Sequence, residues 1–379
     1  MTNDYDIAYR LKEIVLDKIE ICMYGLGIIG ENAGRIYLKH LGVTPDYYCD
    51  SNKKKVDSFT DEHAKAMYLD ELLAYDRSIA VITTVGEHIE KDVTQTLSTN
   101  KKIEIITWKE ICNSETLYRS FLGIDFFPKF HTKKRQLFNA PKKYCGERIA
   151  AFTCITGGYD IPIPIDIMND FCDYYLITDD IIDVDGYSII DVDDVIPKEC
   201  VTPKDKNCYC KMHGFEIFRD YDYSIYIDGN LIITGDLRDL LGYLGDVGLA
   251  FHRHPFSYGP YGESLRMYAA GRINEKDLNN TVQWLLLHDV PSRILYVEGG
   301  VIVSDHRNKK GCQILRDWWN LFITEGMKRD QVCLGYLIYS NGLDENNIGI
   351  IPGSVVGGEY LKKKQYTLLV ICICQKIFI

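Results

Sequence analysis

Short apolar runs alternate with amphipathic stretches along the first third of the chain. Strands are expected at residues 18–24, 45–50, 78–85 and 102–108, and a helical pattern covers residues 61–75. Strands that alternate with helices are typical of a parallel sheet covered on both faces. The pattern ends with the last of these strands, which leaves about half of a full dinucleotide-binding fold.

A glycine motif follows the first of these strands and precedes a helical pattern. Gly25, Gly27 and Gly30 form this motif, and Asp50 ends the second strand about 20 residues further on. Glycines let a phosphate approach the backbone at a helix start, and an acidic side chain suits a ribose hydroxyl. We expect a site for NAD or a nucleotide sugar here, in a domain that resembles small Rossmann-like modules of bacterial sugar-modifying enzymes. A scaffold whose glycine turn holds no ligand is the alternative.

A second α/β pattern begins at residue 149, and three of its strands end in polar or glycine residues. These residues are Thr156, Gly157, Gly158, Tyr159 and Asp160 after the first strand, Thr178, Asp179 and Asp180 at the end of the second, and Asp228, Gly229 and Asn230 at the end of the third. Ligands of open α/β sheets bind outside the carboxyl ends of the strands. The convergence favours a binding site, although Asp228 to Asn230 also fits a tight turn.

Length and charge narrow the class of protein. The 379 residues suggest two domains, which we place at 1–112 and 149–345, with a linker at 113–148 and a tail at 346–379. A formal charge of -11 argues against a nucleic-acid binder. The 13 scattered cysteines and the absence of an apolar leader favour the reducing cytoplasm, and without paired CxxC motifs zinc is not expected.

The apolar stretch "TLLVICIC", residues 367–374, follows the basic residues "KKKQY". It is shorter than the roughly 18 residues that span a bilayer. It therefore either completes a core or makes a peripheral membrane contact.

Seven short motifs occur in a fixed order between residues 149 and 340. They are "TCITGGYD", "YYLITDD", "YSIYIDGN", "FHRHPFSYGPYGE", "VEGGVIVSDHRN", "WWN" and "KRDQ". This set resembles a glycosyltransferase-like family of the GT-A type that bacterial polysaccharide-cluster proteins share with plant mucilage- and turgor-related proteins. The resemblance implies an α/β protein in which a small Rossmann-like parallel sheet domain is followed by a GT-A-like mixed α/β domain.

The resemblance also implies roles for individual residues. Asp228 and Asn230 stand where such enzymes carry Asp-x-Asp, which holds Mn²⁺ or Mg²⁺ against the diphosphate, and His306 is a candidate further ligand. The nucleotide sugar would contact Thr153, Thr156, Gly157, Tyr159, Asp160, Asp179 and Lys211. His254 and Glu263 would face the acceptor. Asp330 is the first choice for the carboxylate beside the reacting carbon, and Glu298 is the second.

The expected function is therefore metal-assisted sugar transfer by a hexosyltransferase-like enzyme of the cytoplasm. The donor would be a nucleotide sugar, and the acceptor a glycan or a lipid-linked glycan of polysaccharide biosynthesis. Three alternatives stay open: a non-catalytic nucleotide-sugar-binding scaffold in which Asn230 marks a degenerate metal site, an NAD-dependent oxidoreductase based on the first domain, and a hydrolase. The sequence contains no GxSxG motif that would support the hydrolase alternative.

Overall fold

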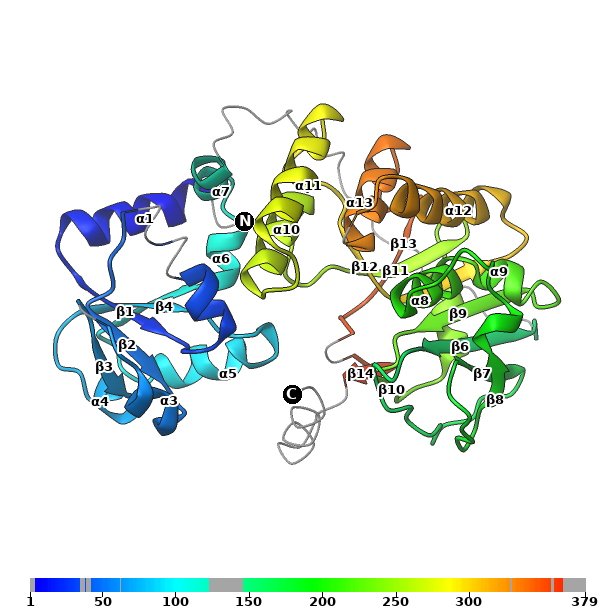
Figure 1. Ribbon diagram of the computed structural model, residues 1–379, viewed down its shortest axis with the longest axis horizontal. Coiled ribbons are helices and arrows are strands. Elements are labelled where there is room, and N and C mark those ends of the chain that lie inside the picture. The colour runs from blue at the N-terminus through cyan, green and yellow to red at the C-terminus, as the bar shows by residue number, and fades with distance from the viewer. Residues whose placement is uncertain are drawn as a thin grey trace. The chain divides into compact units, whose positions relative to one another are not determined.

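The computed structural model describes residues 4–34, 38, 42–61, 63–122, 146–327, 329–355 and 358–363. The chain divides into two compact units, one of Met1–Thr132 with Phe256–Tyr296 and one of Lys133–Pro255 with Val297–Ile379 (Figure 1). Most of the expected linker and the apolar end of the tail lie outside the described residues. Each unit is built on its own α/β sheet, which confirms the expected fold class.

The first unit contains a five-stranded parallel sheet of order β3-β2-β1-β4-β5. Its strands are β1 (Glu20–Tyr24), β2 (Tyr47–Asp50), β3 (Lys65–Tyr68), β4 (Ile79–Thr83) and β5 (Ile103–Thr107). The helical elements that precede or follow them are α1 (Asp4–Leu16), η1 (Ile29–Gly34), α3 (Lys53–Ser58), α4 (Leu69–Leu73) and α5 (Glu87–Leu97). All five residues of β4 are buried, as expected for a central parallel strand covered on both faces.

The helix expected over residues 61–75 is only partly present. Lys65–Tyr68 forms β3, and only Leu69–Leu73 is helical. The register pairs Tyr47 with Lys65 and Asp50 with Tyr68, so hydrogen bonding to β2 overrides the local helical pattern.

The first unit also includes α6 (Trp108–Cys112), α7 (Glu115–Leu122), α10 (Pro260–Ala269) and α11 (Glu275–Leu287). The expected boundaries kept residues 256–296 in the second domain, whereas the compact units assign them to the first. The side-chain amide of Asn113 donates to the Phe256 carbonyl and accepts from the Tyr258 N–H at 3.1 Å. Ser292 Oγ donates to Glu115 Oε2 at 2.7 Å. These polar contacts attach residues 256–296 to the chain around Asn113 and Glu115, between α6 and α7.

The second unit is built on a seven-stranded sheet of order β13-β11-β12-β9-β6-β7-β8. The strands are β6 (Ile149–Ile155), β7 (Cys172–Thr178), β8 (Ser188–Asp191), β9 (Tyr223–Ile227), β11 (Leu249–Arg253), β12 (Val297–Asp305) and β13 (Gly349–Ile351). Only β12 is antiparallel to its neighbours within this sheet. A separate two-stranded pair joins β10 (Leu231–Ile233) to β14 (Leu361–Lys363).

The reversed direction of β12 decides which residues share an edge of the sheet. The carboxyl ends of β6, β7 and β9 lie at one edge, and β12 begins there and runs to the other edge. Helices α8 (Pro203–Met212), α12 (Lys309–Thr324) and α13 (Asp330–Ser340) pack together beside the sheet (Figure 1). The short helical elements of this unit are α9 (Gly214–Ile217), η2 (Val192–Asp194) and η3 (Leu237–Tyr243).

Candidate active site

Asp228 follows directly after the wholly buried strand β9. Its backbone N–H donates to the Gly300 carbonyl at 2.9 Å, and the Tyr226 hydroxyl donates to its Oδ1 at 2.8 Å. Burial raises the pKa of the Asp228 carboxyl, and the positive charge of Lys211 opposes that rise. The carboxylate is thus fixed at the edge where β6, β7 and β9 end, which is where open α/β sheets bind their ligands, and its role in binding stays a prediction.

Lys211 and Asp330 form an almost buried ion pair beside this carboxylate. Lys211 Nζ lies 2.9 Å from Asp330 Oδ2, and the two side chains are only 10% and 14% exposed. Burial alone would raise the pKa of Asp330, but Lys211 and Arg329 outweigh it and hold that pKa well below its ordinary value. Burial likewise opposes the charge of Lys211, but Asp330 and Asp228 raise the pKa of its ammonium. Both groups are therefore ionised near neutral pH.

Two glycines at the start of β12 make room for these charged groups. A Cβ atom on Gly299 would lie 2.9 Å from Lys211 Nζ, and one on Gly300 would lie 3.2 Å from Asp228 Oδ2. The preceding residue, Glu298, accepts a hydrogen bond from the Val355 N–H at 3.2 Å through its Oε1. The "EGG" motif therefore reaches the same edge as Asp228.

The loop after β6 is held by Asp179 and by α8. The Gly157 N–H donates to Asp179 Oδ1 and Oδ2 at 2.9 and 3.1 Å, and Thr156 Oγ1 donates to the Pro203 carbonyl at 2.7 Å. Gly157 has a φ of +64°, and a Cβ there would lie 2.7 Å from Pro203 Cγ. Asp179 thus shapes the loop, and its predicted contact with a nucleotide stays a prediction.

The other predicted nucleotide contacts differ in exposure. Tyr159 is 82% exposed, which leaves its ring open to stacking on a base. Asp160 Oδ1 accepts from the Ile161 N–H at 2.8 Å. Thr153 is buried, its hydroxyl has no hydrogen-bond partner among the described residues, and it lies 3.5 Å from where a Cβ of Gly229 would be. The Thr153 hydroxyl therefore faces the turn that carries Asp228.

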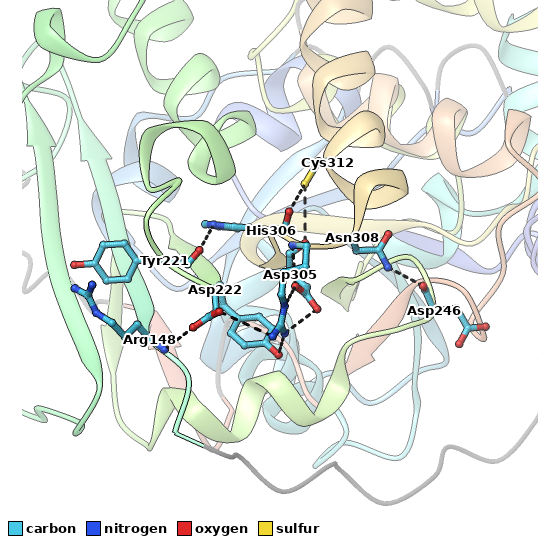
Figure 2. Close-up of polar contacts among 10 residues, drawn as sticks. Arg148, Tyr221, Asp222, Asp246, Asp305, His306, Asn308 and Cys312 are labelled. Atoms are coloured by element: carbon cyan, nitrogen blue, oxygen red, sulfur yellow. Dashed lines mark hydrogen bonds and ion pairs between the residues drawn. The ribbon is translucent and has the colours of Figure 1, made fainter.

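His306 does not join Asp228 and Asn230. The register pairs Val301 with Ile227 and Asp305 with Tyr223, so His306 lies at the edge where β9 begins, opposite to Asp228. There its Nδ1 bonds to the carbonyl oxygen of Tyr221 at 2.9 Å, near Arg148 and Asp222 (Figure 2). The predicted metal ligation by His306 is therefore wrong, because β12 runs antiparallel to β9.

The remaining donor set limits the kind of metal that fits. Within the described part of the chain, no group of three or more His, Cys, Asp or Glu side chains is arranged to hold a metal ion. Asp228 offers one carboxylate and Asn230 one neutral amide oxygen. Mg²⁺ is commonly bound by one or two carboxylates together with substrate phosphates. A divalent cation at this position would therefore need a bound diphosphate for most of its ligands, and its binding stays a prediction.

The predicted acceptor residues are both buried. Glu263 is 1% exposed, and its Oε2 accepts from Ser257 Oγ at 2.9 Å and pairs with Arg266 Nη2 at 2.6 Å. This enclosed carboxylate holds the start of α10 and conflicts with a direct contact to an acceptor. His254 belongs to the other unit and is 8% exposed.

The glycine motif of the first unit is explained in part by its own packing. Asp50 Oδ2 accepts from the Leu26 N–H and Oδ1 from the Asn52 N–H, both at 2.8 Å. A Cβ on Gly30 would lie 2.0 Å from the Gly25 carbonyl oxygen, and Gly25 has a φ of +116°. Asp50 therefore clamps the loop, and nucleotide binding here stays a prediction.

Tyr226, the hydroxyl donor to Asp228, was not among the site residues predicted from the sequence. Its signal was present, because alternate residues of a strand face the same side and Tyr226 precedes Asp228 by two positions. It read as one more apolar residue of a buried strand.

No helix of the described residues is both long enough and apolar enough to cross a membrane. No protein-family model matches the chain, and no curated protein matches it.

Several solved structures of glycosyltransferases are similar at low identity. The apo WbbM bifunctional glycosyltransferase is 11% identical with a TM-score of 0.27 over 88% of this chain, which spans only 38% of that one. The galactosyltransferase LgtC with donor and acceptor sugar analogs is 11% identical with a TM-score of 0.29 over 49% of this chain and 69% of that one. Apo mouse xyloside xylosyltransferase 1 is 9% identical with a TM-score of 0.26, over 88% and 84% of the two chains. Superpositions this weak carry no argument about activity, which depends on the geometry described above.

Proposed function

We propose that the second unit is a glycosyltransferase that moves a sugar from a nucleotide-sugar donor to a glycan or lipid-linked acceptor. The observation that carries this proposal is the meeting of Asp228, Lys211 and Asp330 at the carboxyl edge of the sheet. An ammonium between two carboxylates at the ligand-binding edge suits a diphosphate with its counter-ion and a reacting sugar beside it. The proposal includes that the enzyme is hexosyltransferase-like, that it works in the cytoplasm and that it serves polysaccharide biosynthesis.

The donor would bind through its diphosphate at the end of β9. Asp228 and Asn230 would hold Mn²⁺ or Mg²⁺ there, together with phosphate oxygens of the donor. When bound, the cation acts as a Lewis acid that stabilises the charge on the departing diphosphate. Tyr226 keeps the Asp228 carboxylate oriented by donating to Oδ1. The exposed ring of Tyr159 stacks on the base, and the buried Thr153 hydroxyl faces the turn that carries Asp228.

Asp330 is our choice for the carboxylate that acts on the donor sugar. Lys211 keeps it ionised, which argues against a general acid, and the lowered pKa also makes it a weak base, so it suits an electrostatic stabiliser. Glu298 is the second choice, because Val355 fixes its carboxylate at the same edge.

The second candidate function is a nucleotide-sugar-binding scaffold without turnover. The neutral amide of Asn230 favours it, because one carboxylate holds a cation less firmly than two. We also propose that the glycine loop of the first unit binds a nucleotide, either NAD or a nucleotide sugar. Binding of NAD there would favour the alternative of an NAD-dependent oxidoreductase.

The test is nucleotide binding by the full chain. Calorimetry with UDP and other nucleoside diphosphates, each with and without Mn²⁺, identifies the ligand of the wild type. Asp228→Ala should abolish the gain in nucleotide affinity that Mn²⁺ brings, and Asn230→Asp should increase that gain. Asp194→Ala, at an exposed position on η2, is the control and should leave it unchanged. Unchanged affinity in Asp228→Ala would remove the metal role. Wild-type affinity without turnover of any donor would favour the scaffold.

A further inference from the structure

Gln331 has a buried side-chain amide that bonds to the backbone on both sides of Glu298. Its Oε1 accepts from the Gly299 N–H at 3.0 Å, and its Nε2 donates to the Val297 carbonyl. Gln331 is 8% exposed, so water does not compete for these bonds. In an extended strand, the carbonyl before a residue and the N–H after it point to the same side. One amide therefore fixes the backbone at Glu298, as a neighbouring strand would.

The strand needs this support because its pairing is irregular at that point. The ladder to β9 covers Val301 to Asp305, and the ladder to β11 shifts between Phe251 and His252, which pair with Ile302 and Glu298. Gly299 and Gly300 lie within the irregularity and have no side chains to pack. The "EGG" segment would otherwise carry unpaired backbone groups in a buried place.

The same helix turn holds the other candidate carboxylate. Asp330 pairs with Lys211 at 2.9 Å, and the Asp330 carbonyl accepts from Trp318 Nε1 at 2.7 Å. Adjacent residues at the start of α13 thus contact Lys211 on α8 and the strand that bears Glu298. Any shift of this turn moves both carboxylates together.

We propose that Gln331 is a positioning residue that fixes the backbone of Glu298 relative to the Asp330–Lys211 pair. It acts through Glu298 and Gly299 and does not touch the substrate. The proposal rests on the proposed sugar transfer for its kinetic consequence, but its structural part is independent of the donor. A misplaced carboxylate lowers the rate of the chemical step more than it weakens donor binding.

The experiment compares Gln331→Met, which keeps the length of the side chain and removes both hydrogen bonds, with wild type. Gln313→Met is the matched control, because Gln313 is exposed on α12 and its amide donates to the nearby Asp317 Oδ1 at 2.8 Å. Hydrogen exchange followed by mass spectrometry should show faster exchange over residues 297–301 in Gln331→Met alone. The kcat of sugar transfer should fall about 10-fold or more, with nucleotide Kd and donor KM within about 3-fold. Gln331→Glu keeps the acceptor for the Gly299 N–H, so its exchange rate and kcat should lie between those of wild type and Gln331→Met.

Two results would overturn the proposal. One is wild-type exchange over residues 297–301 in Gln331→Met. The other is a parallel loss of kcat, nucleotide affinity and thermal stability, which marks a merely structural residue. A wild type that turns over no donor would sink the proposed sugar transfer by itself, and the exchange comparison would still decide whether Gln331 holds the strand.

Discussion

Lys211 Nζ lies 2.9 Å from Asp330 Oδ2 and so links α8 to the first turn of α13 across 119 positions of sequence. The ammonium also lies over the rings of Tyr226 and Trp318, 5.7 and 5.3 Å from their centroids. Such a buried pair is weak evidence for stability, but removal of one partner leaves an uncompensated charge. The pair is therefore a sensitive point of the site.

Lys211→Met should destabilise the protein by about 3–5 kcal/mol, because Asp330 would be left buried without its cation. Lys206→Met is the control on the same helix. Lys206 pairs with Asp193 at 2.7 Å, but Asp193 is 70% exposed, so the loss should be at most about 1 kcal/mol. Chemical denaturation measures both. Equal losses would mean that burial of the Lys211 pair is unimportant.

Asp330→Asn should separate binding from chemistry. If the carboxylate acts mainly in the transition state, nucleotide affinity stays within a few-fold while sugar transfer, or donor hydrolysis, falls by roughly 10²-fold or more. Glu298→Gln, measured beside it, tests the second choice. Full activity in the Asp330 variant with loss in the Glu298 variant would reverse the assignment. If Asp330 only pairs with Lys211, asparagine should lower the stability of the folded protein without a separate loss of the rate of transfer in the folded enzyme.

The sheets and the polar ends of β6, β7 and β9 were predictable because alternating apolar segments and strand-end residues are local signals. The direction of β12 was not, since the apolar pattern of a strand is the same in both directions. His306 was therefore placed beside Asp228, although it lies at the opposite edge. Glu263 looked like an acceptor contact because its burial depends on Ser257 and Arg266 in the folded unit.

The packing of residues 256–296 with the first unit also has no local signal. It depends on contacts such as that of Asn113 with Phe256, which are 143 positions apart in sequence. The role of Gln331 was hidden for a related reason. A glutamine after Asp330 reads as part of a polar helix start, and only the folded chain shows that its amide pairs with the strand.

Within the glycine motif of the first unit, substitution of Gly30 should lower thermal stability much more than substitution of Gly27. A Cβ on Gly30 would lie 2.0 Å from a backbone oxygen, whereas a Cβ on Gly27 would meet only Lys55 Nζ at 3.6 Å. Gly30→Ala should therefore lower the thermal midpoint by several degrees, and Gly27→Ala by little. Thermal denaturation with NAD or a nucleotide sugar then tests the ligand. Gly27→Val should abolish any shift if a phosphate approaches this loop.

His252 should make the folded protein sensitive to mild acid. The side chain is 2% exposed, and burial lowers the pKa of its imidazole to about 4, against an ordinary value of about 6.5. Below pH 6.5 the unfolded chain therefore binds a proton that the folded chain does not, so the free energy of unfolding falls from about pH 6.5 to about pH 4, by about 3 kcal/mol at most. Burial also lowers the pKa of His213 and His306, which add to the same dependence of the free energy of unfolding on pH.

The test is chemical denaturation at a series of pH values. The free energy of unfolding should fall less steeply with acid in His252→Asn than in wild type, and as steeply as in wild type in His288→Asn, at the exposed end of α11. Equal slopes in wild type and His252→Asn would show that His252 does not titrate in this way.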